Sequence, residues 1–148
     1  MRAPPILALV VLFCVGHAQA VPAQRGSIAI TMTGFRSDRG TAMVALWRNA
    51  KEFPAKPPED APSRSVPITN GRANARFEGV IAGDFAITVF HDEDGDGELK
   101  ESMFGIPKEG IGFSRDVRPR FRAPRFEDAK LELAPGTTKR ISIRMLYL

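Results

Sequence analysis

The sequence contains few of the side chains that most often carry catalysis or bind transition metals. Cys14 is its one cysteine, and His91 is the one histidine beyond the first twenty residues. A catalytic thiol, a disulfide framework or a zinc site of cysteine and histidine would need partners that the rest of the chain lacks. We therefore expect His91 to be a strand-end side chain that packs beside the acidic loop described below and bonds to a carboxylate.

Two short patterns also lack the surroundings that catalysis requires. Ser114 does not stand in a Gly-x-Ser-x-Gly segment, which argues against a serine hydrolase of that kind. Gly110-Ile111-Gly112 neither follows a predicted strand nor opens a predicted helix. Its glycines therefore indicate a bend in the chain rather than a phosphate-binding loop.

Long apolar runs are absent except at the N-terminus. Arg2 precedes the apolar stretch Ile6 to Val15, and Ala18-Gln19-Ala20 has the small-x-small pattern of a cleavage site. The stretch is too short to span a bilayer, which takes roughly 20 apolar residues. The pattern predicts a signal peptide over residues 1–20, a domain over residues 21–148 without a transmembrane helix, and a periplasmic or secreted location. Phe13 before Cys14 argues against a lipoprotein.

Positive charge is in modest excess, with a formal net charge of +4 and a pI near 9.6. Arginines gather in the segment Arg115 to Arg125, where Pro119 and Pro124 interrupt them. Phe121 and Phe126 lie among these arginines, but no nucleic-acid-binding motif surrounds them, so we expect no nucleic-acid partner. The segment is either an anion-binding face for an acidic partner, a polysaccharide or an envelope component, or a basic loop that balances the acidic turn.

Alternation of apolar and polar residues predicts about seven short strands and no amphipathic helix. Turn residues separate them at short intervals, which is typical of an all-β fold with a single antiparallel β-sandwich. Phenylalanines after the acidic turn predict a long but ordered loop there. The predicted strands are Ser27 to Phe35, Thr41 to Trp47, Val66 to Thr69, Ala73 to Phe77, Asp84 to His91, Ala129 to Leu133 and Lys139 to Leu148.

Two local features sharpen this pattern. Asn70-Gly71 is the residue pair best able to adopt the positive φ values of a tight turn, so the strands on either side of it are predicted to form a β-hairpin. Pro67 lacks a backbone donor and places its strand at a sheet edge. The strand Thr41 to Trp47 is apolar on both faces and is therefore expected to be central.

The acidic turn after the strand Asp84 to His91 has the spacing of a calcium loop. Asp92, Asp94 and Asp96 occupy alternate positions, and Gly97 stands where a calcium loop needs a sharp turn. Calcium takes oxygen ligands, so we predict these carboxylates as ligands, joined by the backbone carbonyl of Glu98 and a closing carboxylate from Glu101.

Other features of the turn limit this interpretation. Met103 stands where a helix–loop–helix site would have its bidentate glutamate, and a strand precedes the loop, so an EF-hand is excluded. Leu99 is expected to point into the core. The alternative is a solvated acidic turn that binds no ion.

Three blocks of sequence carry a resemblance to a known family. They are Ala82 to Leu99, with a strand that ends in His-Asp before the Gly-rich turn, Phe104 to Ser114, with Phe-Gly-Ile-Pro-Lys-Glu-Gly, and Pro124 to Ala129, with Phe-Glu-Asp-Ala. In this order they resemble the bacterial domain of unknown function 2141 family. The resemblance implies an exported all-β protein with an Ig-like or prealbumin-like β-sandwich, and it implies no activity. Lys100 and Ser102 stand where family members often have Asp and Asn.

The sequence leaves three functions open. The first is an exported non-enzymatic protein in which calcium orders the segment Asp92 to Phe126 as a recognition surface. The second is a hydrolase or carbohydrate-active enzyme that uses a carboxylate pair such as Glu109 and Asp128, which would require a raised pKa on one of them. The third is a purely structural envelope protein.

Overall fold

The computed structural model describes residues 24–120 and 122–148, so the predicted signal peptide lies outside the described residues. Most of the elements are strands, joined by one short 3₁₀ helix and one short α-helix. In chain order they are β1 (Arg25–Thr33), β2 (Thr41–Trp47), β3 (Ser63–Pro67), β4 (Arg72–Ile81), β5 (Gly83–Asp92), β6 (Ile111–Phe113), η1 (Ser114–Asp116), α1 (Phe126–Ala129), β7 (Leu131–Leu133) and β8 (Thr138–Arg144).

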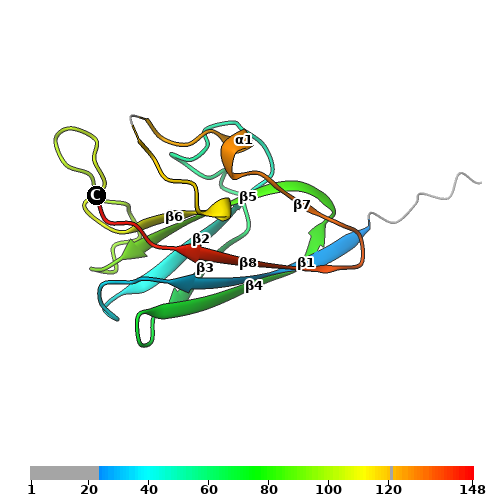
Figure 1. The fold of residues 1–148 in the computed structure, drawn as a ribbon, viewed down its shortest axis with the longest axis horizontal. Coiled ribbons are helices and arrows are strands. Elements are labelled where there is room, and N and C mark those ends of the chain that lie inside the picture. The colour runs from blue at the N-terminus through cyan, green and yellow to red at the C-terminus, as the bar shows by residue number, and fades with distance from the viewer. Residues whose placement is uncertain (1–23, 121) are drawn as a thin grey trace, which may run out of the picture.

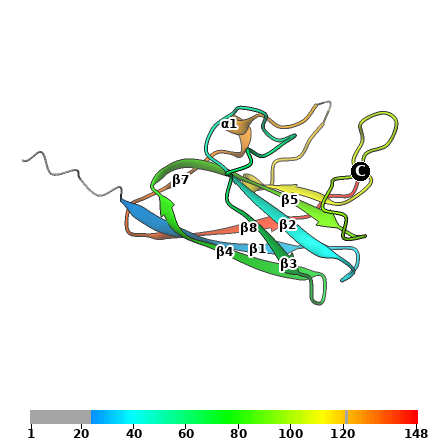
Figure 2. The ribbon, with the colours of Figure 1, turned by 180° about the vertical axis from the view of Figure 1, so that it is seen from behind.

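The strands form two sheets that face each other (Figures 1 and 2). The three-stranded sheet has the order β4-β1-β8, and the five-stranded sheet has the order β3-β2-β5-β6, with β7 paired to β5. This confirms the predicted all-β, two-sheet architecture. One pairing departs from an antiparallel sandwich, because β8 runs parallel to β1. Within residues 24–120 and 122–148, no helix has the length and apolar character needed to cross a bilayer.

The main core lies between the sheets and follows the alternation in the sequence. Ile28, Ile30 and Met32 of β1 are buried against apolar side chains of β5, of which Phe85 and Ile87 are fully buried. Strands with one inward face bury every second residue, and burial of apolar surface is the main driving force of folding. Among the described residues, the buried members of this core lie between Ile28 and Met145.

A second, smaller cluster covers the outer face of the five-stranded sheet. Trp47 of β2 and Ala86 of β5 are buried there against Phe126 and Ala129 of α1, with Phe53 packed at the side. This cover explains why β2 is apolar on both faces. The prediction of a central strand is confirmed, because β2 lies between β3 and β5.

The turn at Asn70-Gly71 is present, but the predicted β-hairpin around it is wrong. Asn70 and Gly71 have φ values of 52° and 68°, and Thr69 and Arg72 form a single bridge across them. Beyond this bridge β3 pairs with β2 while β4 pairs with β1, so the two strands enter different sheets. The turn is therefore a corner between the sheets, and Pro67 lies in an edge strand as predicted.

The bend expected at Gly110-Ile111-Gly112 is instead the start of a strand. Ile111–Phe113 forms β6, which pairs with β5. An ideal Cβ at Gly112 would lie 2.7 Å from Cγ2 of Ile143, so a side chain there would collide with β8. Glycine therefore allows close packing between the sheets at this position.

Candidate metal centre

The acidic loop begins where β5 ends, and neighbouring backbone holds that end of the strand in place. The backbone N–H of His91 donates to the carbonyl of Gly110 over 2.8 Å. On the other side Gly40 lies so close that an ideal Cβ would be 1.8 Å from the carbonyl oxygen of Asp92. The first carboxylate of the loop therefore starts from a well-anchored strand end.

The three aspartates of the predicted calcium loop are brought together. Asp92, Asp94 and Asp96 each offer a ligand oxygen, and these oxygens all lie within 4.8 Å of one another. Asp92 is buried, while the other two are exposed. Gly97 has a φ of 78°, which confirms the sharp turn expected at this position. The group has the all-oxygen chemistry that hard divalent cations prefer.

Hydrogen bonds within the loop fix the buried carboxylate. Oδ1 of Asp92 accepts the backbone N–H of Gly95 over 2.8 Å, and Oδ2 accepts that of Gly97 over 3.0 Å. Asp96 in turn accepts the backbone N–H of Glu98 over 2.9 Å. The backbone thus wraps around Asp92, which orients that side chain without any bound group.

Lys100 supplies a positive charge to the same place. Its ammonium contacts the carboxylate of Asp94 and lies 3.2 Å from Oδ2 of Asp96. All three side chains are about half exposed. A lysine ammonium therefore partly neutralises the two outer carboxylates, and a metal ion shared by all three aspartates would have to displace it.

Other residues of the predicted site lie outside the aspartate cluster. Glu98 and Glu101 are exposed, and Glu101 forms an isolated bridge with Pro107. Their roles as ligands stay predictions. Leu99 was expected to point into the core, and this is wrong, because it is 36% exposed.

Glu109 holds the two ends of the acidic loop together. Its side chain is buried, with Oε1 accepting the backbone N–H of Glu93 over 3.0 Å and Oε2 accepting that of Lys100 over 3.1 Å. The sequence suggests Glu109 only as a candidate catalytic carboxylate. The sequence carries no signal for its structural role, since that role depends on the chain returning to the loop many residues later.

A buried polar network lies beneath the loop. Nδ1 of His91 lies 2.8 Å from the Tyr147 hydroxyl, and Nε2 lies 2.8 Å from the carbonyl of Arg39. A carbonyl can only accept, so Nε2 carries a proton. His91 was predicted to bond to a carboxylate. The carboxylate of Glu93 is near, but its Oε1 lies 3.5 Å from Nδ1, too far for a good hydrogen bond. Tyr147 takes that place instead.

Arg36 completes this network. It donates from Nε to Glu93 Oε1 over 2.6 Å, and its guanidinium stacks over the Tyr147 ring. The hydrogen bond that Arg36 donates to Glu93 raises the pKa of Arg36. Burial raises the pKa of Tyr147 above its usual value of 10.0. The network joins the ends of β1, β5 and the C-terminal segment next to the acidic loop.

Comparison with known proteins identifies the family. The sequence profile of a family described as "Uncharacterized protein conserved in bacteria (DUF2141)" matches residues 30–141. The chain belongs to this family. No curated protein matches the DUF2141 chain. The match begins within β1, ends within β8 and includes the whole acidic loop, so the resemblance carried by the three sequence blocks is confirmed.

Solved structures add little to this assignment. Two structures of a pilus-presented adhesin, Spy0125 (Cpa), one of them a cysteine-to-alanine variant, align with 84% of the DUF2141 chain at 12% identity, with TM-scores of 0.25 and 0.23. The chain spans 27% of the adhesin's length. No conclusion about the function of the DUF2141 chain follows from so low a similarity.

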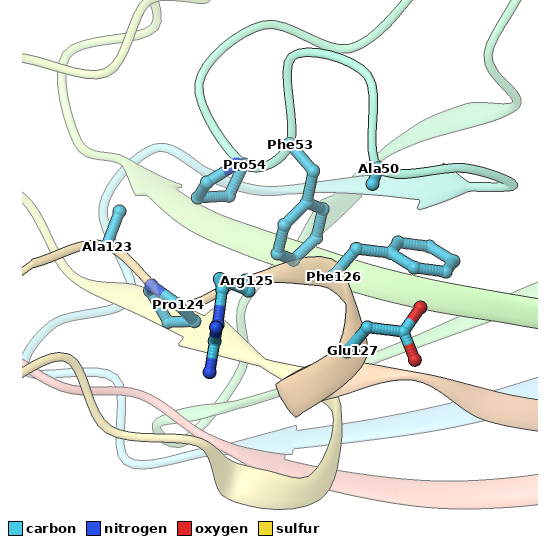
Figure 3. Close-up of a pocket in the computed structure, with 8 residues that line it drawn as sticks. All are labelled: Ala50, Phe53, Pro54, Ala123, Pro124, Arg125, Phe126 and Glu127. Atoms are coloured by element: carbon cyan, nitrogen blue, oxygen red, sulfur yellow. The ribbon is translucent and has the colours of Figure 1, made fainter.

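Val117, in the arginine-rich segment of the DUF2141 chain, packs against the small cluster on the outer face of the five-stranded sheet. The five arginines of the segment are exposed. An open hollow is lined by residues of the 48–55 connection, of the chain just before α1, including the end of the arginine-rich segment, and of α1 itself (Figure 3). These are Ala50, Phe53, Pro54, Ala123, Pro124, Arg125, Phe126 and Glu127. The surface combines aromatic, proline and charged groups.

Proposed function

We propose that this DUF2141 protein is exported, is not an enzyme and binds calcium through Asp92, Asp94 and Asp96. The observation that carries the proposal is the convergence of three carboxylate oxygens within 4.8 Å at the end of a buried strand. Carboxylates are ligands that calcium prefers over nitrogen or sulfur. Glu98 and Glu101 are the chain's proposed additional ligands, and water fills any remaining positions.

Two features of the loop support this proposal. Asp92 is already oriented by the N–H groups of Gly95 and Gly97, so little ordering is needed at that ligand. Lys100 is about half exposed, and an exposed ion pair contributes only about 0–1 kcal/mol, so its displacement by a divalent ion costs little. Two of the three carboxylates are exposed, so we expect an affinity toward the weak, roughly millimolar end of extracellular calcium modules.

The ion would stiffen the excursion from Asp92 to Phe126 and so present the arginine-rich segment Arg115 to Arg125 to an acidic partner, a polysaccharide or an envelope component. Both ends of the excursion are anchored, since Asp92 and Phe126 are buried. Asp116 adds a tether by accepting the backbone N–H of Arg144 over 2.8 Å. Exposed guanidinium groups between these anchors suit carboxylate or phosphate groups.

The alternative of an enzyme with Glu109 and Asp128 receives less support. Both oxygens of Glu109 accept backbone N–H groups, which occupies them structurally. The backbone N–H of Arg125 lowers the pKa of Asp128, whereas a general acid needs a raised one. A purely structural envelope protein remains the second candidate, and it predicts no response to calcium.

A calcium titration by calorimetry with thermal melting tests the proposal. Binding to the folded state alone raises the free energy of unfolding, by about 2.7 kcal/mol when calcium is a hundred times the Kd. The melting temperature should rise with calcium in the wild type and in Asp60→Asn, a control at an exposed carboxylate outside the loop. It should not rise in the Asp94→Asn, Asp96→Asn double variant. An unchanged wild-type melt at millimolar calcium would overturn the proposal.

Export is tested separately. The full-length chain is expressed in a bacterium, the envelope fraction is isolated and the N-terminus of the recovered protein is sequenced. Cleavage after Ala20 gives a chain that begins with Val21. Recovery of the uncut chain from the cytoplasm would contradict the export half of the proposal and leave the calcium half standing.

A further inference from the structure

The excursion after the acidic loop ends in an exposed apolar tip. Met103 is 96% exposed and Phe104 is 85% exposed, and Ile106 beside them is 46% exposed. The yellow-green loop that carries them projects from the end of the sandwich near the C-terminus in both views (Figures 1 and 2). Large apolar side chains exposed to this degree at one point mark an interaction site.

The loop has a hairpin-like form that holds this tip away from the sandwich. Glu101 and Pro107 form an isolated bridge, and the N–H of Lys108 donates to the carbonyl of Lys100 over 2.8 Å. The two sides of the loop are therefore joined through their backbones, and the apolar side chains are presented at its tip.

Hydrogen bonds inside the tip satisfy several of its backbone donors. The N–H groups of Phe104 and Ile106 donate to Oγ of Ser102 over 3.4 and 3.2 Å. Gly105 donates to the carbonyl of Ser102 over 3.0 Å, and Ser102 donates to that of Ile106 over 2.7 Å. Such internal pairing suits an apolar medium, because a backbone group that enters lipid must find its partner within the protein.

We propose that Met103 and Phe104 insert into the interfacial layer of a lipid bilayer. Two large side chains on one narrow projection are too few for a standard protein interface, which buries roughly 1,200–2,000 Å². A bilayer accepts such a tip without a matching pocket. Attachment through so small an anchor is weak and reversible, as it is for a single short lipid chain.

One cation beside the tip is available to lipid headgroups. Lys100 is paired with Asp94 and Asp96 of the acidic loop, so the available cation is Lys108. Lys108 is exposed and forms no ion pair with any residue that the structure describes. Its long side chain can extend along the apolar tip while the ammonium reaches lipid phosphate.

Vesicle sedimentation tests this proposal with the chain from Val21 onward, which contains the whole of the described core. The vesicles are phosphatidylethanolamine with phosphatidylglycerol. All buffers contain chelator, so the result does not depend on the proposed calcium site. We expect Met103→Ser with Phe104→Ser to weaken partitioning at least about tenfold. Ile81→Ser is the matched control, because Ile81 is 50% exposed at the end of β4, outside the tip, and its partitioning should stay within about twofold of the wild type.

A fluorescent side chain locates the inserted residue. Trp47 is the one native tryptophan and is buried, so it contributes a constant background. In the Phe104→Trp variant, the added tryptophan should emit at shorter wavelength on vesicles, and brominated lipid should quench this emission. In the control Glu59→Trp, in an exposed connection, the added tryptophan should show neither effect. Failure of the wild type to sediment at millimolar lipid, unchanged sedimentation of the double serine variant, or no quenching of Phe104→Trp would each overturn the proposal.

Discussion

Lys100 places its ammonium against the carboxylate of Asp94, inside the group of carboxylates proposed to bind calcium. The lysine thus competes with any metal ion for the same oxygens. It also reduces the repulsion between Asp94 and Asp96, since its ammonium lies 3.2 Å from Oδ2 of Asp96. The side chain has opposite effects with and without calcium, and this makes it the most informative position in the loop.

The substitution Lys100→Met separates these two effects. Without calcium we expect a small loss of stability, at most about 1 kcal/mol, because an exposed ion pair is removed. With calcium we expect the Kd to fall by about three- to fivefold, because no ammonium has to leave. Calorimetry in calcium and thermal melting in chelator measure the two quantities. Lys108→Met serves as the control, and equal affinities in all three proteins would contradict the proposed competition.

Gly40→Ala should be among the most destabilising substitutions in the chain. Gly40 has a φ of 69°, and an added Cβ would lie 1.8 Å from the carbonyl oxygen of Asp92, so β5 would have to move. We expect a loss of at least about 3 kcal/mol in the free energy of unfolding, measured with urea. Gly79→Ala is the control for backbone strain alone, because its φ is 63° and nothing lies within 4 Å. That control should cost about 1–2 kcal/mol.

The single tyrosine allows the buried network to be titrated directly. Burial raises the pKa of Tyr147 above 10.0, so the folded protein holds the phenol proton more tightly than the unfolded chain does. The resulting stabilisation is fully present below pH 10.0 and is lost as the pH rises through the folded-state pKa. Absorbance of the tyrosinate should give a midpoint above 10.0 in the native protein and near 10.0 in denaturant. Equal midpoints in the two states would show that this burial is absent.

Ser114 has a structural role that its sequence context does not indicate. Its buried hydroxyl donates to the carbonyl of Ala129 over 2.6 Å and accepts the N–H of Ile87 over 3.0 Å, which ties β5 to the end of α1. Ser114→Ala leaves buried polar groups without partners, and we expect a loss of about 1–3 kcal/mol in urea unfolding. Ser142→Ala, at an exposed position of β8, should stay within about 0.5 kcal/mol of the wild type. Similar values for both variants would contradict this role.

Much of the local structure could be predicted because it depends on near neighbours in the chain. Alternation placed Ile28, Ile30 and Met32 on the buried face of β1, and the structure confirms this. Asn70-Gly71 adopts the predicted positive φ values, and the spacing of the three aspartates brings their oxygens together. Each of these follows from side-chain period or from backbone preference over a few residues.

Pairing between distant segments could not be predicted in the same way. β6 was missed because three residues are too few for a clear period, and its glycine is required by close packing against Ile143. The hairpin prediction failed because each of its strands gains a longer partner elsewhere, β3 with β2 and β4 with β1. Such choices depend on the total surface buried by both sheets rather than on the turn itself.

The sequence by itself determined that the chain forms short strands, that a sharp turn follows β5 and that three carboxylates stand at alternate positions in it. Only the tertiary structure decided what surrounds those carboxylates. It brings Glu109 under the loop and Tyr147 against His91. The reason is physical: side-chain period and turn preference act over a few residues, whereas contacts between distant segments form only when the whole chain packs together.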